Sequence, residues 1–316
     1  MKQKAKTAII LSGLVTVTLH VINRIQYSNY TMKDVLANPD NHYYEWRFGK
    51  VRYTKKGTGT PLLLLHDLTV GSSAYEFHKV IDALAENHEV YALDFLGYGL
   101  SDKPNMTYTN YLYVQLVNDF IKNIIGKKTD IIATGDAAPV AVMVCHNAPE
   151  EINKMIFINP QSLYRLNQIP SKQTRAMKLI METPILGTFI YNLYTSRTSI
   201  EKLFQNEYFF DPKKIDPADI TAYLEACHQQ DYKSKFAYTS YLGRYLNANI
   251  IHAVKEINHS IYILAGKEKE DNDTIVENYE YYNSSIESVY VEKTKQLPHL
   301  EKPVEVLKEL KTFLND

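Results

Sequence analysis

The sequence has little of what marks several protein classes. Only two cysteines, Cys145 and Cys227, occur among 316 residues, too few for a disulfide framework and without the paired spacing of a zinc site. An excess of charge of one sign is also missing, because 35 Lys and Arg balance 36 Asp and Glu to a net charge of −1. This balance argues against nucleic-acid binding. No phosphate-binding glycine loop or His-Glu-x-x-His motif is present, so we expect no nucleotide cofactor and no metal.

What is present is the composition of a globular protein. Hydrophobic residues make up 45% of the chain and charged residues 22%, so the chain can bury a large core. At roughly 150 residues per domain, the length fits about two units or one large α/β domain that carries an insertion.

The amino terminus has the features of a membrane signal. Three lysines within the first six residues precede an apolar run over residues 7–23, which Arg24 closes. A basic segment followed by an apolar one is typical of a secretory signal, and no small-residue cleavage site follows it. We therefore expect residues 1–24 to form an uncleaved anchor, with the domain on the outer side of the membrane. A cleaved signal peptide, or a surface or core helix, stays open as an alternative.

Beyond a predicted linker over residues 25–41, strand and helix patterns alternate. Short apolar runs of the kind buried on both faces of a sheet alternate with amphipathic segments, and this order predicts a mostly parallel, doubly wound α/β sheet. Ser73 and Glu76 have the spacing of a capping box, which predicts a helix through Glu86. The predicted strands are 43–48, 50–55, 61–66, 89–94, 130–134, 154–159, 260–265 and 288–291, and the other core helices are 110–125, 139–147 and 303–314.

The middle of the chain lacks strand signals. From residue 161 to about 258, helical periodicity is broken by prolines at 170, 184, 212 and 217, which predicts several short helices. The simplest interpretation is a helical cap over residues 161–258, inserted into an α/β core formed by residues 42–160 and 259–316.

Three motifs stand at the ends of predicted elements. Residues 62–67 read Leu-Leu-Leu-Leu-His-Asp, residues 93–104 read Leu-Asp-Phe-Leu-Gly-Tyr-Gly-Leu-Ser-Asp-Lys-Pro, and residues 297–303 read Leu-Pro-His-Leu-Glu-Lys-Pro. Together they closely resemble the α/β-hydrolase superfamily, in the cap-bearing branch that includes esterases, haloalkane dehalogenases and epoxide hydrolases. The resemblance covers about residues 50–316. It implies a pocket at the carboxyl ends of the strands, roofed by the cap.

The resemblance implies a nucleophile on the turn after the strand at 130–134. The family pattern there is Gly-x-Ser-x-Gly, whereas residues 135–139 read Gly-Asp-Ala-Ala-Pro. Aligning the first glycine puts Ala137 in the serine position, and a methyl group cannot attack a carbonyl. A shift by one residue would make Asp136 central, and aspartate is the nucleophile of the dehalogenases and epoxide hydrolases. A polar residue that caps the next helix is the alternative interpretation of Asp136.

The base and acid positions also depart from the family pattern. Relatives carry Gly-His before Leu-Pro-His-Leu-Glu, but this chain has Gln296 as the last residue before that motif, and an amide cannot take a proton at neutral pH. His299 matches a second family histidine and is a candidate base, or else a local structural residue. At the acid position Lys269 replaces the expected aspartate. A shifted loop would make Glu268, Glu270 or Asp271 the candidate carboxylate, and a charged surface turn is the alternative interpretation.

The region expected to hold the ligand and the oxyanion contains His66, Asp67 and Ala138. Family members usually have His-Gly where this chain has His66-Asp67. Asp67 would bring negative charge to the place where an oxyanion develops, and that opposes acyl transfer. His66 is expected to hold the loop in shape.

Three interpretations of function follow. The first is a membrane-anchored α/β-hydrolase-fold protein with weak or absent serine-hydrolase activity, which binds a small apolar or ester-like ligand under the cap or serves as a scaffold. The second is an active ester, epoxide or halide hydrolase with Asp136 as nucleophile and His299 as base. The third is a structural membrane protein without a pocket. The degenerate triad favours the first interpretation, in which no cofactor takes part.

Overall fold

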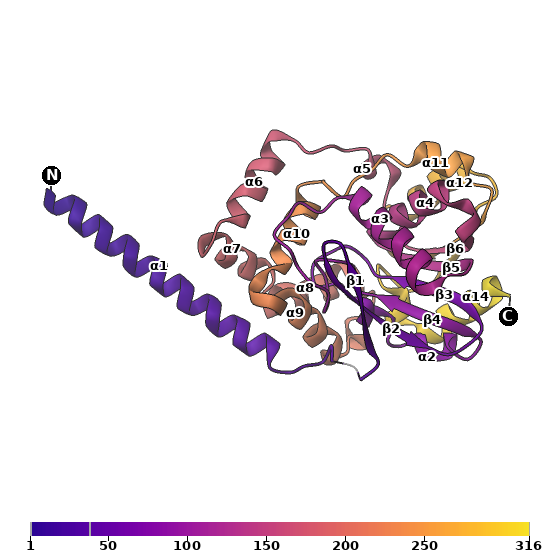
Figure 1. The fold of residues 1–316 in the computed structure, drawn as a ribbon, viewed down its shortest axis with the longest axis horizontal. Coiled ribbons are helices and arrows are strands. Elements are labelled where there is room, and N and C mark those ends of the chain that lie inside the picture. Colours follow the sequence, from indigo (N-terminus) through magenta and orange to yellow (C-terminus); the bar gives the residue numbers. More distant parts are fainter. Residues whose placement is uncertain (1, 38, 316) are drawn as a thin grey trace.

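Eight strands of the described part of the chain form one sheet. The computed structural model describes residues 2–37 and 39–315, with the side chains of residues 2–12 and of Asp231 outside the described part. The strand order is β1-β2-β4-β3-β5-β6-β7-β8 (Figure 1). The strands are β1 Asn41–Trp46, β2 Gly49–Lys56, β3 Thr60–Leu65, β4 His88–Leu93, β5 Thr129–Thr134, β6 Ile152–Ile158, β7 Ser260–Gly266 and β8 Glu287–Val291.

The pairing of the strands places all the predicted site loops at one edge. Strand β2 pairs antiparallel with β1 and β4, whereas β4, β3, β5, β6, β7 and β8 pair in parallel. The carboxyl ends of these six strands therefore lie together. This is the mostly parallel sheet that the alternating sequence pattern predicted, and it is the position at which such sheets bind ligands.

Helices cover both faces of the sheet because its central strands are apolar on both sides. In β3, Leu63 and Leu65 pack into the core cluster that contains α3 and α4, whereas Leu62 and Leu64 pack into the cluster beneath α2 and α14. Successive side chains of a strand point to opposite faces, so a run of four leucines serves both layers. The flanking helices are α2 Ile81–Leu84, α3 Asn110–Phe120, α4 Ala138–Asn147, α11 Ile251–Glu256, α12 Asn272–Tyr282, α13 Pro298–Glu301 and α14 Pro303–Leu314.

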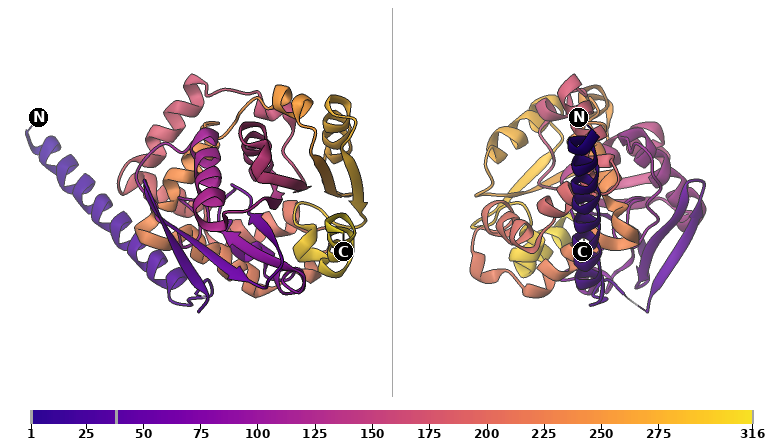
Figure 2. Two further views of the ribbon diagram at one scale, coloured as in Figure 1. Left: turned by 45° about the vertical axis from the view of Figure 1, so that its right-hand side comes forward. Right: turned by 90° about the vertical axis from the view of Figure 1, so that its left-hand side faces the viewer.

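A helical cap follows β6 and lies over the carboxyl ends of the strands (Figures 1 and 2). Its helices are α5 Leu163–Leu166, α6 Lys172–Glu182, α7 Leu186–Tyr194, α8 Arg197–Leu203, α9 Pro217–Tyr232 and α10 Ser234–Leu242. The predicted cap extended to residue 258, but α11 packs on α4 and α12 of the core. Ala253 and Val254 of α11 are buried in the main core cluster, so we place α11 with the core.

The chain begins with a long helix, α1 Lys2–Thr31, which projects from the body of the molecule (Figures 1 and 2). Its carboxyl-terminal part packs on α7 and α9 of the cap. Tyr30 lies against His228 of α9, with ring centroids 4.7 Å apart. Within the described residues, no helix has the length and apolar character needed to cross a membrane.

Two local predictions need correction. The predicted linker over residues 25–41 is helical as far as Thr31, because its side chains pack on the cap. The helix predicted from Ser73 to Glu86 is instead a 3₁₀ turn, Ala74–Phe77, followed by α2. Ser73 makes no side-chain cap bond, and the buried carboxylate of Glu76 accepts the backbone N–H of Asp67 at 3.2 Å instead of completing the capping box.

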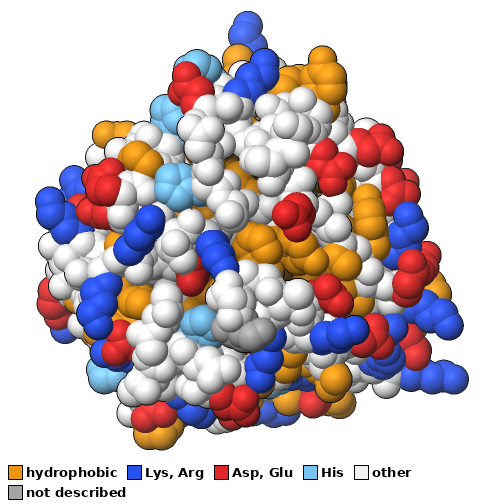
Figure 3. Space-filling model, turned by 90° about the vertical axis from the view of Figure 1, so that its right-hand side faces the viewer, with side chains coloured by type: hydrophobic (Ala, Val, Ile, Leu, Met, Phe, Trp, Pro, Cys, Tyr) orange, Lys and Arg blue, Asp and Glu red, His pale blue; other side chains and the backbone are white. Residues whose placement is uncertain are grey.

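The surface does not gather charge of one sign. On the face drawn in Figure 3, Lys and Arg side chains are interspersed with Asp and Glu. This distribution agrees with the net charge of −1.

Candidate active site

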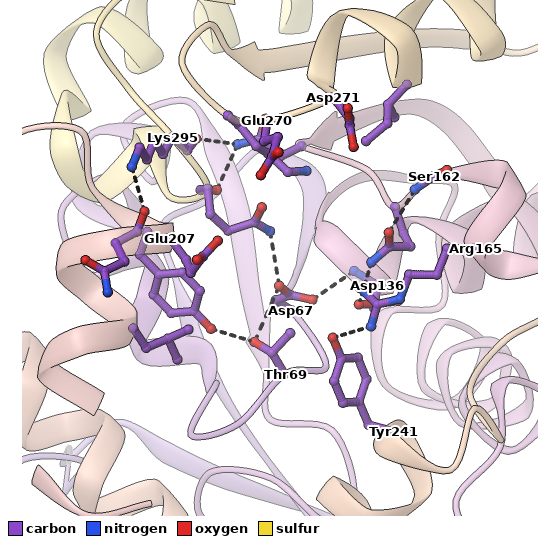
Figure 4. A pocket seen from close by; sticks show the side chains of 18 of the residues that line it. Asp67, Thr69, Asp136, Ser162, Arg165, Glu207, Tyr241, Glu270, Asp271 and Lys295 are labelled. Carbon is purple, nitrogen blue, oxygen red and sulfur yellow. Dashed lines mark hydrogen bonds between the residues drawn. The ribbon is translucent and has the colours of Figure 1, made fainter. Parts of the chain in front are cut away.

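A cavity of about 930 Å³ lies between the carboxyl ends of the strands and the cap. The loops that follow β3, β5, β6, β7 and β8 line it from below, and residues of α5, of α10 and of the chain from 203 to 208 line it from the cap. Figure 4 shows Asp67 near the centre of this cavity, with Asp136 and Arg165 to one side and Tyr241 below them. The predicted roofed pocket is therefore present.

The turn after β5 is centred on Gly135. This glycine has φ +54°, and no other residue between β5 and the end of α4 has a positive φ. A strained turn from strand to helix is where a nucleophile of this fold stands. The sequence prediction placed Ala137 or Asp136 there; instead, Ala137 is buried in the first turn before α4 and Asp136 follows the turn. The residue with positive φ at this turn thus has no side chain.

The Asp67 carboxylate occupies the space next to Gly135. Its Oδ1 accepts the backbone N–H groups of Leu68 at 2.7 Å and Asp136 at 2.8 Å, and its Oδ2 accepts from Gln296 Nε2 at 3.3 Å. A Cβ built on Gly135 would lie 2.4 Å from Asp67 Cγ. The Asp67 carboxylate can therefore occupy this position only because residue 135 has no side chain.

The two N–H groups that hold Asp67 come from the positions that form an oxyanion hole in this fold. One belongs to the residue after the turn at the nucleophile position, and the other belongs to the loop after β3. In this chain both donate to a carboxylate of the protein itself. An oxyanion formed on a substrate would have to displace it.

Burial alters the protonation of the carboxylates. Desolvation raises the pKa of Asp67 to about 7, and the nearby Asp136 carboxylate contributes to this increase. Burial also raises the pKa of Asp136, against the opposing influence of the Arg165 guanidinium. Two buried carboxyl groups of like charge share one site, so their protonation is coupled.

The acid and base positions hold a cation and an amide. Lys269 follows β7 and lines the cavity, where burial lowers the pKa of its ammonium group to about 8 although Asp67 and Asp136 oppose the decrease. Gln296 follows β8 and donates to Asp67. The side chain of Gln296 therefore positions a carboxylate rather than accepting a proton.

His299 does not stand at the cavity. Its side chain is fully buried, and neither ring nitrogen has a hydrogen-bond partner among the described residues. The ring stacks on Phe77 with centroids 5.4 Å apart, and Nε2 lies 4.0 Å from Glu76 Oε1. Burial lowers its pKa to about 3. Pro298 opens α13 and directs the next side chain into the core, so His299 is not placed to serve as the predicted base.

The remaining predicted residues divide between the cavity and the scaffold. Asp271 lines the cavity and is exposed, in a left-handed conformation with φ +59° before α12. His66 Nδ1 lies 2.6 Å from the Asp67 carbonyl, and its Nε2 accepts from Phe95 N–H at 3.0 Å. These bonds hold the loop after β3. Ala138 is buried as the first residue of α4.

Comparison with known proteins identifies the family. Residues 62–309 match the alpha/beta hydrolase family. The chain belongs to this family.

Individual relatives are more distant. The chain is 32% identical over 118 residues to a 2-hydroxy-6-oxo-6-(2'-aminophenyl)hexa-2,4-dienoic acid hydrolase of Metapseudomonas resinovorans, over 36% of this chain and 40% of that protein. It is 22% identical over 176 residues to a cis-3-alkyl-4-alkyloxetan-2-one decarboxylase of Shewanella oneidensis, over 54% of this chain and 53% of that protein. The matched segments thus span about two fifths to one half of these relatives.

Solved structures of alpha/beta hydrolases share the fold. The epoxide hydrolase CorEH, solved without ligand, has a TM-score of 0.71 and 19% sequence identity to this chain, and the match covers 87% of this chain and 98% of CorEH. Naproxen esterase from Bacillus subtilis has a TM-score of 0.68 and 17% identity, over 93% of this chain and 98% of that chain. These similarities establish the architecture.

The cap of this alpha/beta hydrolase supplies site residues that the motifs did not reveal. Arg165 of α5 donates to the hydroxyl of Tyr241 of α10 at 2.5 Å, and Gln161 donates to Asp136 at 3.2 Å. No motif marks these residues, because the cap follows no fixed pattern in the sequence. Gly135 did leave a signal: Ala133 and Ala137 are the small residues on either side of it.

The site is characterised by its charged side chains. It holds two coupled carboxyl groups, a lysine and an arginine around one cavity. Within the part of the chain that the structure describes, no three His, Cys, Asp or Glu side chains converge as metal ligands would.

Proposed function

We propose that this alpha/beta hydrolase binds a small molecule in the cavity under its cap and does not hydrolyse esters by the serine mechanism. The observation that carries the proposal is the Asp67 carboxylate, which fills the oxyanion hole opposite Gly135.

Each requirement of acyl transfer is unmet at its usual position. Gly135 offers no hydroxyl or carboxyl group to attack a carbonyl. Gln296 has no proton-accepting nitrogen for a nucleophile to use. A negative charge already bound in the oxyanion hole repels a second one, whereas the tetrahedral intermediate needs stabilisation there. The alternative mechanism, with Asp136 as nucleophile, needs His299 as a base, and His299 is buried away from the cavity.

The lining supports a ligand with an apolar body and at least one polar group. The volume of about 930 Å³ lies in the range of small-molecule sites. Tyr208, Tyr238 and Tyr241 present rings to the cavity, and Arg165 and Lys269 present positive charge. An ester-like or carbonyl-bearing molecule fits both kinds of lining.

A hydrolysis assay tests the proposal. The full chain is incubated with short p-nitrophenyl esters beside Asp136→Asn, Gly135→Ser and the combination of Asp67→Gly, Gly135→Ser, Lys269→Asp and Gln296→His. We expect the parent and both single variants to show no turnover above background. The combined variant restores hydroxyl, base, acid and an empty oxyanion hole, so we expect it to gain activity.

A matched control separates position from chemistry. Ala137→Ser makes a similar small-to-hydroxyl change two residues further along the chain, at a buried site, and we expect it to stay inactive even with the other three substitutions. Turnover by the parent protein that Asp136→Asn abolishes would contradict the proposal and make Asp136 the nucleophile.

We further propose that the amino-terminal segment attaches the protein to a membrane, with the domain on the outer side. The basic start and the apolar run over residues 7–23 support this. Within this run, apolar side chains of α1 are exposed, among them Leu14, Val15 and Val17. In a density-gradient flotation experiment we expect the full chain to float with phosphatidylglycerol vesicles. A variant lacking residues 2–22 should remain at the bottom of the gradient. Flotation of both, or of neither, would contradict the anchor.

A further inference from the structure

The amino group of Lys269 differs from those of the other lysines near the cavity. Lys267 pairs with Asp273 at 3.0 Å, and Lys295 donates to the carbonyl of Asn206 at 2.6 Å. Lys269 lines the cavity, but among the described residues its Nζ makes no hydrogen bond and lies within 4.0 Å of no carboxylate. A lysine that merely balanced charge would be paired. The side chain of Lys269 instead lines the cavity and has no such partner among the described residues.

The surroundings of Lys269 favour the neutral amine. Burial lowers its pKa to about 8, while the carboxylates of Asp67 and Asp136 raise it and the guanidinium of Arg165 lowers it. At about pH 7.5 roughly a quarter of the molecules then carry a neutral amine, against about a thousandth for an ordinary lysine. Neutral lysine amines in desolvated pockets attack carbonyl carbon.

We propose that Lys269 captures an aldehyde or ketone in the cavity as a Schiff base. The inference rests on the proposed ligand binding and names its chemical class. The nitrogen lone pair of Lys269 forms a bond to the carbonyl carbon, and a proton moves from nitrogen to the former carbonyl oxygen. The resulting carbinolamine then loses its hydroxyl group as water, and a carbon–nitrogen double bond remains. The two amine hydrogens and the carbonyl oxygen leave together, so no oxidant or reductant is needed.

We assign the proton transfers to the two carboxyl groups of the cavity. Asp67 and Asp136 line the same cavity as Lys269. With its pKa raised to about 7 by burial, Asp67 exists in both protonation states near neutral pH and can donate a proton to the departing hydroxyl and accept one from nitrogen. This gives a function to the carboxylate that occupies the oxyanion hole.

Reductive trapping tests the proposal. The full chain is incubated with 4-nitrobenzaldehyde and sodium cyanoborohydride, which reduces the imine to a stable amine, and the adduct is located by peptide mass mapping. We expect one adduct on Lys269, formed about tenfold or more faster than on any exposed lysine. Lys295→Met removes another lysine that lines the cavity, and Lys267→Met removes an exposed lysine two residues before Lys269. Both control variants should keep the adduct, whereas Lys269→Met should lose it.

The pH profile provides a second readout that does not require the methionine variant to fold. We expect labelling to rise with a midpoint near the Lys269 pKa of about 8. In Asp67→Asn the midpoint should move to lower pH, because the carboxylate that favours the ammonium form is gone. Labelling spread equally over Lys267 and Lys295, or a midpoint that Asp67→Asn leaves in place, would overturn the proposal.

A matched non-reactive probe separates this inference from the proposed binding. 4-Nitrobenzyl alcohol has the same body but cannot form an imine, and its binding is measured by calorimetry. If the alcohol binds and the aldehyde leaves Lys269 unlabelled, the lysine inference fails while the cavity remains a binding site. If neither probe engages the protein, both proposals fail for this class of ligand.

Discussion

At the scale of single residues, the position of the Asp67 carboxylate depends on the glycine at position 135. A residue with φ +54° at the turn favours glycine. The absence of a Cβ there makes room for a carboxylate that two backbone N–H groups bind. The space next to the turn is therefore occupied by the Asp67 side chain, from the loop after β3, and not by a side chain of residue 135.

A double-mutant cycle measures this dependence. Gly135→Ala should lower the free energy of unfolding by about 2–4 kcal/mol, since its Cβ must displace the carboxylate and adopt a positive φ. In an Asp67→Gly background the same change should cost only about 1 kcal/mol, because the backbone conformation alone remains unfavourable. Urea unfolding of the four proteins gives the coupling energy.

The cycle has a control in the same protein. Gly126 also has a positive φ, +66°, but nothing lies within 4 Å of a Cβ built there. Gly126→Ala should cost about 1 kcal/mol in either background. Additive effects of the changes at positions 135 and 67 would show that the two side chains do not compete for space.

At the scale of elements, helix α1 is joined to the cap by a buried polar contact. Asn23 of α1 donates to the Ile185 carbonyl at 3.1 Å and accepts from Asn192 of α7 at 2.9 Å. Asn23 is only 3% exposed. The sequence suggested an apolar segment that ends at Arg24. In the structure, Asn23 at the end of that segment belongs to a packed interface between α1 and the cap.

Asn23→Ala should destabilise the protein by about 1–3 kcal/mol. The change leaves the buried Asn192 amide without its acceptor, and an unpaired buried polar group of this kind is costly. The Ile185 carbonyl loses one of its two bonds and keeps the one from Phe189 N–H at 2.8 Å. Thr18→Ala on the exposed face of the same helix should change stability by less than about 0.5 kcal/mol. Thermal unfolding of both variants checks the difference; equal effects would mean that α1 does not pack on the cap in solution.

At the scale of the whole molecule, a few polar contacts fasten the cap over the cavity. The Glu301 carboxylate accepts the backbone N–H groups of Phe210 at 3.0 Å and Asp211 at 2.8 Å. On the other side, the hydroxyl groups of Tyr208 and Thr69 lie 3.0 Å apart. These bonds hold the cap segment around residues 204–214 against the core, where residues 206–208 line the cavity.

Glu301→Gln should loosen this segment. Hydrogen bonds to a charged acceptor contribute about 1.5–3 kcal/mol, so we expect faster amide hydrogen exchange at Phe210 and Asp211 and a smaller effect elsewhere. Glu305→Gln is the control, because Glu305 is exposed and, among the described residues, pairs only with Lys302 at 2.9 Å, and surface pairs contribute little. Unchanged exchange at Phe210 in Glu301→Gln would contradict this account of the cap.

The sequence by itself determined the family, the order of strands and helices, and the loops that carry the site. These features follow from short-range patterns: apolar runs such as residues 62–65, and motifs that end at fixed positions along a strand. It also indicated that Asp67, Lys269 and Gln296 depart from the family pattern.

Only the tertiary structure decided which atoms meet. Which residue lies at the centre of the turn after β5 is decided by the positive φ of Gly135. The sequence Gly-Asp-Ala-Ala-Pro alone allows a shift of one or two residues. The burial of His299 and the contribution of Arg165 depend on how the cap and the loops pack. The pKa values and the free volume of the site depend on burial and on which distant segments lie close together. A local sequence pattern contains no information on either burial or such long-range contacts.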